Sequence, residues 1–409
     1  MAVDLSVNFC GVRFENPFVL AAAPPTDNAE MVARGFEAGW AGAILKTTSV
    51  ESEQVSLVYP MMTGLDLDGQ RLAALENIDL ISERHIDQVE KDVRWLKKEF
   101  PRKVVAASIM GAKKEHWEEL VRRLEAAGVD LIECSFSCPH GMPEKGMGSA
   151  VGQNPELTEK TARWVKEAAR RVPVIIKLTP QIADISAAAE AVKRSGADGV
   201  TAINTVKGLM GVDLDSFVPY PNVGGYSTYG GVSGPAIKPV ALRCVAEIAR
   251  KVDIPVSATG GVTTWRDAAE FLLVGARTVQ VCTEVMRHGY RVVEDMIDGL
   301  ANYLEDKGFD RVEQLIGKAL PKVVEHSQLP RGARVRAHVD PDKCIRCGVC
   351  YVACRDGGHG AMEFGADRLA RVNEDKCVGC GFCTTTCPVD DCLTLRVGPA
   401  EDAAGRAAS

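Results

Sequence analysis

The chain has 409 residues, of which 25% are charged and 46% hydrophobic, and its formal net charge is −7. These values are ordinary for a globular protein and do not suggest nucleic-acid binding. No apolar stretch approaches the roughly 20 residues of a membrane-spanning helix. The N-terminal MAVDLSVNF lacks the basic start of a signal peptide, so we expect a cytoplasmic protein that does not bind membranes.

From Pro17 to about Glu305, short apolar runs alternate with longer stretches that have helical spacing. Near-continuous apolar strands separated by helices indicate parallel strands that are buried on both faces. Eight such units predict an α/β (β/α)8 TIM barrel, with an open doubly wound sheet as the alternative. No dinucleotide fingerprint follows the first run. The runs are PFVLAAAP, AGAILKTTS, KVVAASIMG, VDLIECSFSC, PVIIKLTP, DGVTAINT, PVSATGG and TVQVCTE.

The C-terminal ends of these runs are polar, although the bodies of the runs are not. In a TIM barrel the reacting groups come from these strand ends. We therefore expect the active site where they meet. The polar ends include residues 46–49, 135–138, 177–180, 204–205, 259–261 and 282–284.

The last two strand ends of a barrel commonly bind phosphate. Gly260 and Gly261 would let backbone N–H groups approach a phosphate closely, and the YGGVSG segment (229–234) is a second glycine loop of this kind. A single lysine at a strand end is more often solvated or salt-bridged. Two of them, Lys46 and Lys177, beside a phosphate site favour flavin mononucleotide (FMN), because a cation near its N1–C2 region stabilises the reduced anion.

Two C-terminal segments, DKCIRCGVCYVAC and DKCVGCGFCTTTCP, repeat at an offset of 33 residues with the spacing C-x2-C-x2-C-x3-C. In two-cluster ferredoxins the fourth cysteine of each motif binds the other cluster. The sequence thus predicts two [4Fe–4S] clusters, although paired zinc sites are an alternative that seldom needs the third and fourth cysteines. The first cluster is predicted at Cys344, Cys347, Cys350 and Cys387, and the second at Cys377, Cys380, Cys383 and Cys354.

These motifs divide the chain into an FMN barrel at 1–328, a linker at 329–341, a ferredoxin-like domain at 342–397 and a disordered tail at 398–409. Two clusters form a path for single electrons, which requires a donor at one end and an acceptor at the other. We therefore expect the barrel to contain a redox centre.

Several motifs together resemble the dihydropyrimidine dehydrogenase family, whose flavin barrel is related to dihydroorotate dehydrogenase. They are ILKTTS, ENIDLIS, ASIMG, SCPHGM with KGMG, KLTP, INTVKGL, YGGVSG with IKPVALR, and ATGG. With the ferredoxin repeat, the resemblance covers nearly the whole chain and is strongest to the PreA-type subunits, which have these two modules. SCPHGM followed by KGMG is the most specific match.

The resemblance implies roles for residues at the strand ends. Cys138 matches the general acid of the family, and the glycine-rich segment 139–152 would be a lid that carries it. The substrate-binding residues would be Asn77, Ser135, Ser137, Asn204 and Thr205. The FMN-binding residues would be Ala22, Lys46, Thr47, Lys177, Gly231, Gly260, Gly261, Cys282 and Thr283.

The chemistry of a thiol suits the role of Cys138. The family reduces the 5,6 double bond of a pyrimidine such as uracil or thymine, reversibly, and the carbon next to a carbonyl must receive a proton. A thiol with a pKa of about 8.5 is mostly protonated at pH 7 and can donate that proton. A buried structural cysteine is the alternative, which we assign to Cys10, Cys134 and Cys244.

One position departs from the family pattern. The family has Asn-x-Ser-Cys before the catalytic cysteine, whereas this chain has Ser135-Phe136-Ser137-Cys138. A serine hydroxyl is shorter than an amide and cannot both donate to and accept from the edge of a cyclic amide. The substrate could therefore be a related cyclic amide or enoyl compound.

No segment resembles a binding site for NAD(P)H or FAD, so the resemblance implies a PreT-type partner subunit that carries both. We expect a homodimer core within a heterotetramer. Two other functions stay open: a related FMN and iron–sulfur oxidoreductase with another substrate, and a non-catalytic electron-transfer subunit.

Overall fold

The computed structural model describes residues 3–50, 56–67, 69–79, 81–136 and 148–398. The chain divides into two compact units, Met1–Val323 and Val324–Ser409, which are described separately. Within the described residues, no helix has both the length and the apolar character needed to cross a membrane.

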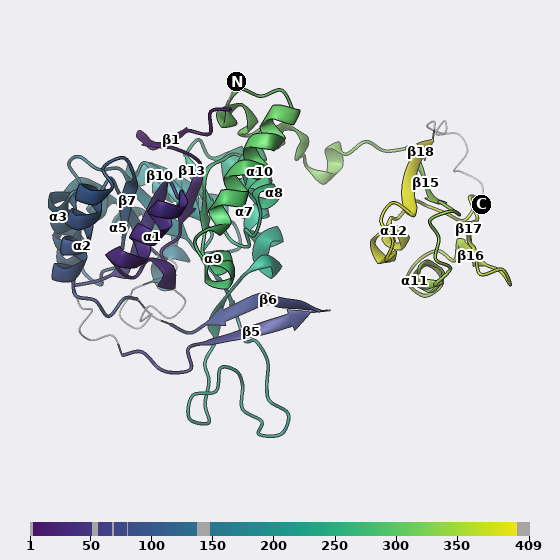
Figure 1. Cartoon of the computed structure of the whole chain (residues 1–409), viewed down its shortest axis with the longest axis horizontal. Coiled ribbons are helices and arrows are strands. Elements are labelled where there is room, and N and C mark those ends of the chain that lie inside the picture. Colours follow the sequence, from purple (N-terminus) through teal and green to yellow (C-terminus); the bar gives the residue numbers. More distant parts are fainter. Residues whose placement is uncertain (1–2, 51–55, 68, 80, 137–147, 399–409) are drawn as a thin grey trace. The chain divides into compact units, whose positions relative to one another are not determined.

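The first unit is a closed barrel of eight parallel strands, so the predicted TIM barrel is confirmed (Figure 1). Each strand corresponds to one of the eight apolar runs, and neighbouring strands in the barrel follow one another along the chain. The strands are β3 (Phe18–Leu20), β4 (Gly42–Thr48), β7 (Val104–Ile109), β8 (Leu131–Ser135), β9 (Val174–Leu178), β10 (Gly199–Ala202), β13 (Val256–Thr259) and β14 (Ala276–Val281).

Helices connect successive strands and cover the outside of the barrel. All six residues of β7 are buried, as expected for a strand between a barrel core and a helical layer. A short hairpin of β1 (Val7–Phe9) and β2 (Val12–Phe14) precedes the barrel. The helices are α1 (Ala29–Ala38), α2 (Ile86–Glu99), α3 (Lys114–Ala127), α4 (Ser149–Gly152), α5 (Pro155–Ala168), α6 (Ile185–Ser195), α7 (Lys238–Lys251), α8 (Trp265–Leu273), α9 (Thr283–His288) and α10 (Val292–Asp306).

The helix ends have clear local causes. The side chain of Asn28 begins α1 by accepting the N–H of Met31 at 2.9 Å. Asn154 caps α5 in the same way and is followed by Pro155 at the first helical position. Gly39 ends α1 in the left-handed conformation that glycine adopts without strain.

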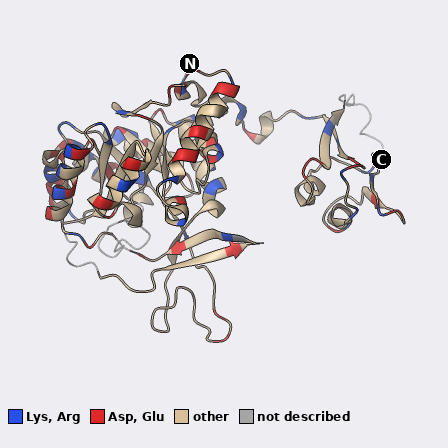
Figure 2. Ribbon diagram, viewed as in Figure 1, with Lys and Arg blue, Asp and Glu red and all other residues tan. Residues whose placement is uncertain are grey.

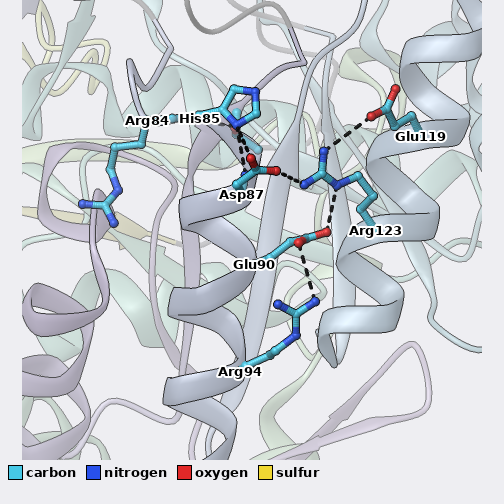
Figure 3. Close-up of polar contacts among 8 residues, drawn as sticks. Arg84, His85, Asp87, Glu90, Arg94, Glu119 and Arg123 are labelled. Atoms are coloured by element: carbon cyan, nitrogen blue, oxygen red, sulfur yellow. Dashed lines mark hydrogen bonds and ion pairs between the residues drawn. The ribbon is translucent and has the colours of Figure 1, made fainter.

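Ion pairs connect α2 and α3 on the outside of the barrel (Figure 3). The Arg123 guanidinium on α3 bonds the carboxylates of Asp87 and Glu90 on α2, and lies 3.5 Å from Glu119 on its own helix. Hydrogen bonds from Arg123 lower the pKa of both Asp87 and Glu90. Such exposed pairs contribute little individually, and here they link two neighbouring helices.

A four-stranded antiparallel sheet, which the sequence did not predict, stands at the C-terminal end of the barrel. Its strands are ordered β11 (Val206–Gly208), β12 (Gly230–Ser233), β6 (Gln70–Asn77) and β5 (Met62–Leu67). The YGGVSG segment, predicted to be a glycine loop, contributes β12 because it pairs with β11 on one side and β6 on the other.

A buried carboxylate ties both ends of the long 209–229 loop to this sheet. Glu76 on β6 is fully buried and accepts the N–H of Met210 at 2.7 Å and of Gly230 at 2.8 Å. Between these points the loop exposes Leu214 and Phe217, whose exposed fractions are 83% and 80%. The loop and the β5–β6 hairpin project from the same end of the barrel (Figure 1).

The second unit has two small antiparallel pairs and two short helices. Strand β15 (Arg334–Val339) pairs with β18 (Leu393–Gly398), and β16 (Met362–Phe364) pairs with β17 (Ala370–Val372). The helices are α11 (Val349–Gly357) and α12 (Phe382–Thr386). The predicted linker therefore contains a strand of this unit, since β15 is held by β18. Beyond Gly398, the predicted tail lies outside the described residues.

Candidate active site and cluster sites

The C-terminal ends of the barrel strands surround an open cavity of about 1210 Å³, and β6 and β12 of the antiparallel sheet contribute to its wall. Every described residue predicted to bind FMN or substrate lines this cavity: Ala22, Lys46, Thr47, Lys177, Gly231, Gly260, Gly261, Cys282, Thr283, Asn77, Ser135, Asn204 and Thr205.

The two predicted lysines have different carboxylate partners. The ammonium of Lys46 on β4 lies 2.8 Å from Asp79, whereas that of Lys177 on β9 lies 3.7 Å from Glu133 on β8. Both carboxylates are almost or fully buried. Each cation is therefore held at the cavity by a charge of opposite sign.

Glycines shape one corner of the cavity, as expected for a phosphate site. Gly260 and Gly261 have φ angles of 126° and 77°, which favour glycine. A Cβ atom on Gly261 would lie only 2.7 Å from the backbone nitrogen of Lys238. The backbone can therefore approach a ligand here only because no side chain intervenes.

Asp267 on α8 holds this corner together. Its Oδ2 accepts the backbone N–H groups of Thr263 and Thr264 at 2.9 and 2.8 Å, and its Oδ1 lies 2.6 Å from the Lys238 ammonium on α7. Burial acts to raise the pKa of Asp267, but the hydrogen bonds from Lys238, Thr263 and Thr264 lower it below its usual value. The turns before α7 and α8 are thus tied to one ionised carboxylate.

The strand register brings the predicted substrate and FMN residues together. Ser135 on β8 pairs with Lys177 on β9, and Asn77 on β6 pairs with Gly231 on β12. The side chain of Asn77 accepts the N–H of Asp79. Ser137 and Cys138, with the proposed lid up to residue 147, lie outside the described residues.

Cys282 and Thr283 lie at the opposite wall, after β14. The Thr283 hydroxyl bonds that of Ser233 at 2.9 Å, and the Cys282 sulfur lies 3.7 Å from the Met286 sulfur. Burial raises the pKa of Cys282 to about 11, so its thiol stays protonated at neutral pH. A protonated thiol at this wall is a weak donor rather than a nucleophile.

Three polar residues of the site were not predicted from the sequence: Asp79, Glu133 and Gln280. Asp79 follows Asn77 by two residues in ENIDL, so it could have been recognised as a companion residue. Glu133 is the only charge within the buried run LIECS, and Gln280 the only amide in the last strand. An isolated polar residue in a barrel strand was the available signal.

In the second unit, each set of four cysteines surrounds its own void. Cys344, Cys347, Cys350 and Cys387 line one of about 350 Å³, together with Cys392. Cys354, Cys377, Cys380 and Cys383 line the other, of about 410 Å³. In each set one cysteine comes from the other motif, which is the grouping of the predicted crossed pattern. Among the described residues, no group of three or more His, Cys, Asp or Glu could hold a single metal ion.

Backbone N–H groups point at two of these sulfurs. Ala337 donates to the Cys377 sulfur at 3.5 Å, and Ala361 donates to the Cys354 sulfur at 3.3 Å. N–H donors to sulfur are one of the means by which proteins tune cluster potentials.

A parallel barrel whose open end combines a glycine corner with two lysines, carried on one chain with two four-cysteine sites, defines a flavin- and iron–sulfur-dependent oxidoreductase. Residues 4–304 match the dihydroorotate dehydrogenase family and residues 337–395 match the 4Fe–4S dicluster domain family. The second match favours clusters over the zinc alternative.

Sequence comparison with known proteins shows which kind of flavin- and iron–sulfur-dependent oxidoreductase this chain resembles. The chain is 44% identical over 366 residues, 88% of each chain, to the NAD-dependent dihydropyrimidine dehydrogenase subunit PreA of Escherichia coli K12. It is 41% identical to the chloroplastic NADP(+) dihydropyrimidine dehydrogenase of Arabidopsis thaliana, covering 80% of this chain and 79% of that one. It is 36% identical to the catalytic subunit of dihydroorotate dehydrogenase B of Pyrococcus horikoshii, covering 77% of this chain and 98% of that one.

The chain therefore belongs to the dihydropyrimidine dehydrogenase family, as a PreA-type member, and the predicted resemblance is confirmed. It is an oxidoreductase of the kind that acts on CH–CH bonds. A crystal structure of the dihydroorotate dehydrogenase of Eimeria tenella with ferulenol has the same fold, with a TM-score of 0.65 and 21% identity over 77% of this chain and 88% of that one.

Proposed function

We propose that this chain catalyses the reversible reduction of the 5,6 double bond of a pyrimidine, uracil or thymine, with electrons that reach its FMN through two [4Fe–4S] clusters. One observation carries the proposal. The residues assigned to FMN and those assigned to substrate, where described, line a single cavity at the active end of the barrel. Two four-cysteine voids on the same chain fit the electron supply.

The residues that line the cavity suit FMN in their chemistry. The phosphate would meet the backbone of Gly260 and Gly261, where a Cβ atom would be obstructed. The Lys238 ammonium beside this corner is already engaged by Asp267 and Glu270, at 2.6 and 2.9 Å. Phosphate binding would thus rest mainly on N–H groups, which suit a phosphate at a glycine turn.

When bound, FMN supplies a hydride to one carbon of an activated double bond. The chain must then provide a proton to the neighbouring carbon, next to a carbonyl, and we assign this to the Cys138 thiol. Strand β8 reaches the cavity at Ser135, three residues earlier, and three residues of extended chain span at most about 10 Å. Cys138 is therefore within reach of the cavity by chain length alone.

The substrate edge would be bound by Asn77, Asn204 and Thr205, which come from two different parts of the wall. Ser135 is buried at the point where the family has asparagine. A missing amide contact that leaves a substrate group unpaired costs about 1–3 kcal/mol. This observation favours the second candidate, reduction of another cyclic amide or enoyl compound by the same chemistry.

The electron source would be a separate subunit. We propose a PreT-type partner that binds FAD and NAD(P)H, and a homodimer of this chain within a heterotetramer in the cytoplasm. The exposed, largely uncharged 209–229 loop is the kind of surface found at protein interfaces (Figure 2). Mass determination in solution, with and without the partner, tests the assembly.

Anaerobic flavin bleaching tests the function. The reconstituted chain is mixed with 5,6-dihydrouracil, 5,6-dihydrothymine or other saturated cyclic amides, and flavin absorbance is followed. Bleaching by the dihydropyrimidines is the expected result. Bleaching by other compounds alone would favour the second candidate, and none by any compound would favour a non-catalytic electron-transfer subunit.

A further inference from the structure

A layer of polar side chains crosses the inside of the barrel and reaches the cavity at Gln280. It contains Glu133 on β8, Thr201 on β10, Ser257 on β13, and Thr278 and Gln280 on β14, and all five residues are at most 2% exposed. Such layers are normally filled by branched apolar side chains. A carboxyl side chain at this depth therefore calls for a specific explanation.

The two oxygens of Glu133 have different surroundings. Oε2 accepts the Thr201 hydroxyl at 2.7 Å and the Gln280 amide nitrogen at 3.2 Å. Oε1 has no hydrogen-bond partner among the described residues, and it faces the Lys177 ammonium at 3.7 Å. One oxygen thus anchors the side chain, and the other remains for the cation.

The orientation of Gln280 supports this division. Its amide nitrogen also approaches the hydroxyls of Thr201 and Ser257, at 3.1 and 3.0 Å. Ser257 in turn accepts the Thr278 hydroxyl at 2.8 Å. Reversing the amide would place its oxygen against the Glu133 carboxylate, so the network orients its donors toward the negative charge.

The separation of 3.7 Å determines what Lys177 can still do. It is short enough for a strong electrostatic attraction in a buried site, yet too long for a hydrogen bond. The ammonium carries three N–H donors, and Glu133 occupies none of them at this distance. Lys177 lines the cavity, so its donors are available to a bound molecule.

We propose that Glu133 is a positioning residue for the cofactor: it holds the Lys177 ammonium in place at the cavity, so that reduced FMN is bound more tightly than oxidised FMN. This inference rests on the proposed binding of FMN. Reduced FMN carries a negative charge on its ring, whereas the oxidised ring is neutral, so only the reduced form gains from a fixed cation. Without the carboxylate, the buried ammonium would lose the partner that fixes its position, and the gain would be lost.

The test measures the dissociation constants of oxidised and reduced FMN for the full chain. Free FMN is separated by ultrafiltration under anaerobic conditions and quantified after release, so cluster absorbance does not interfere. Glu133→Gln is expected to weaken binding of reduced FMN at least tenfold more than binding of oxidised FMN. For a two-electron couple this tenfold ratio equals a flavin potential lower by about 30 mV.

Glu125→Gln is the matched control. Glu125 is a buried carboxylate on α3 that accepts the backbone N–H groups of Arg170, Arg171 and Val172, and it does not line the cavity. Its substitution should lower thermal stability and leave the ratio of the two FMN constants unchanged. A purely structural role for Glu133 would give this same pattern.

If Glu133→Gln does not fold, Thr201→Val carries the test, because it removes one anchor of Oε2 and keeps the charge. The expected change is about threefold in the same direction. An unchanged or inverted ratio in a variant that binds FMN overturns the inference alone. A wild-type chain that binds no FMN overturns the proposed function and this inference together.

Discussion

Substitution of Asp267 by Asn should loosen the phosphate corner and destabilise the barrel. The variant keeps the shape of the side chain but removes the charge that receives the Lys238 ammonium and the N–H groups of Thr263 and Thr264. Hydrogen bonds to charged groups contribute about 1.5–3 kcal/mol and neutral ones about 0.5–1.5. Weakening two of the short contacts in this way should cost about 2–3 kcal/mol in free energy of unfolding.

The two readouts are the melting temperature and the FMN dissociation constant. For a unit of this size, 2–3 kcal/mol corresponds to a fall in Tm of about 5 °C. We expect the FMN dissociation constant to rise about tenfold, because the two glycine turns lose their common anchor. The matched control is Glu270→Gln, since Glu270 also approaches Lys238, at 2.9 Å, but is about half exposed and lies outside the turn. It should change stability by less than about 1 kcal/mol.

The pH dependence gives the sharpest check. The pKa of Asp267 is lowered in the folded chain, so its contribution is present above the unfolded pKa of about 3.9 and is lost as the pH falls through the folded pKa. The difference in Tm between wild type and Asp267→Asn should therefore be full at pH 7 and shrink below about pH 4. An equal difference at pH 7 and pH 3 would refute the reasoning, because the effect would then not depend on ionisation.

Three further predictions concern other parts of the chain. Cys138→Ala should keep FMN but slow bleaching by dihydropyrimidines at least about 100-fold, because in this direction the same group must accept the proton that it donates in the reduction, and near-normal bleaching would remove the assignment. Cys354→Ala should lose the second cluster, whereas Cys392→Ala should keep all eight irons. Iron analysis and electron paramagnetic resonance distinguish the two variants. Loss of a cluster in Cys392→Ala would contradict the ligand pattern. Gly261→Ala should weaken FMN binding more than tenfold, because a Cβ atom there would meet Lys238 at 2.7 Å, and unchanged affinity would place the phosphate elsewhere.

The barrel was predictable because parallel strands buried on both faces read as apolar runs, and all eight runs became strands. The place of the site followed from the same pattern, since polar strand ends stand out against apolar bodies, whereas the roles of individual residues came from the family resemblance. The two cysteine motifs were equally clear because their spacing fixes a geometry. The barrel strands and the cysteine motifs are each encoded in a short continuous segment, so both could be predicted from the sequence.

The antiparallel sheet was not predicted because its strands are short and pair across long stretches of chain. Gly230–Ser233 has two glycines and reads as a loop, and only its pairing with β11 on one side and β6 on the other makes it a strand. The Glu133 network was missed for a related reason. Its members come from separate strands, and nothing in any one strand indicates that Gln280 and Thr201 meet Glu133.

The 209–229 loop is attached to Glu76 at both of its ends, and this attachment separates the sequence of the outer loop from the structure of the cavity wall. Because both ends of the loop are fixed at one carboxylate, changes between them need not reach the cavity wall. Doubling the length of a flexible loop costs only about 0.6 kcal/mol in closure entropy. The sequence of this outer segment could therefore change by evolution or design. Such a change would alter which protein surface the loop contacts, without altering the reaction at the cavity.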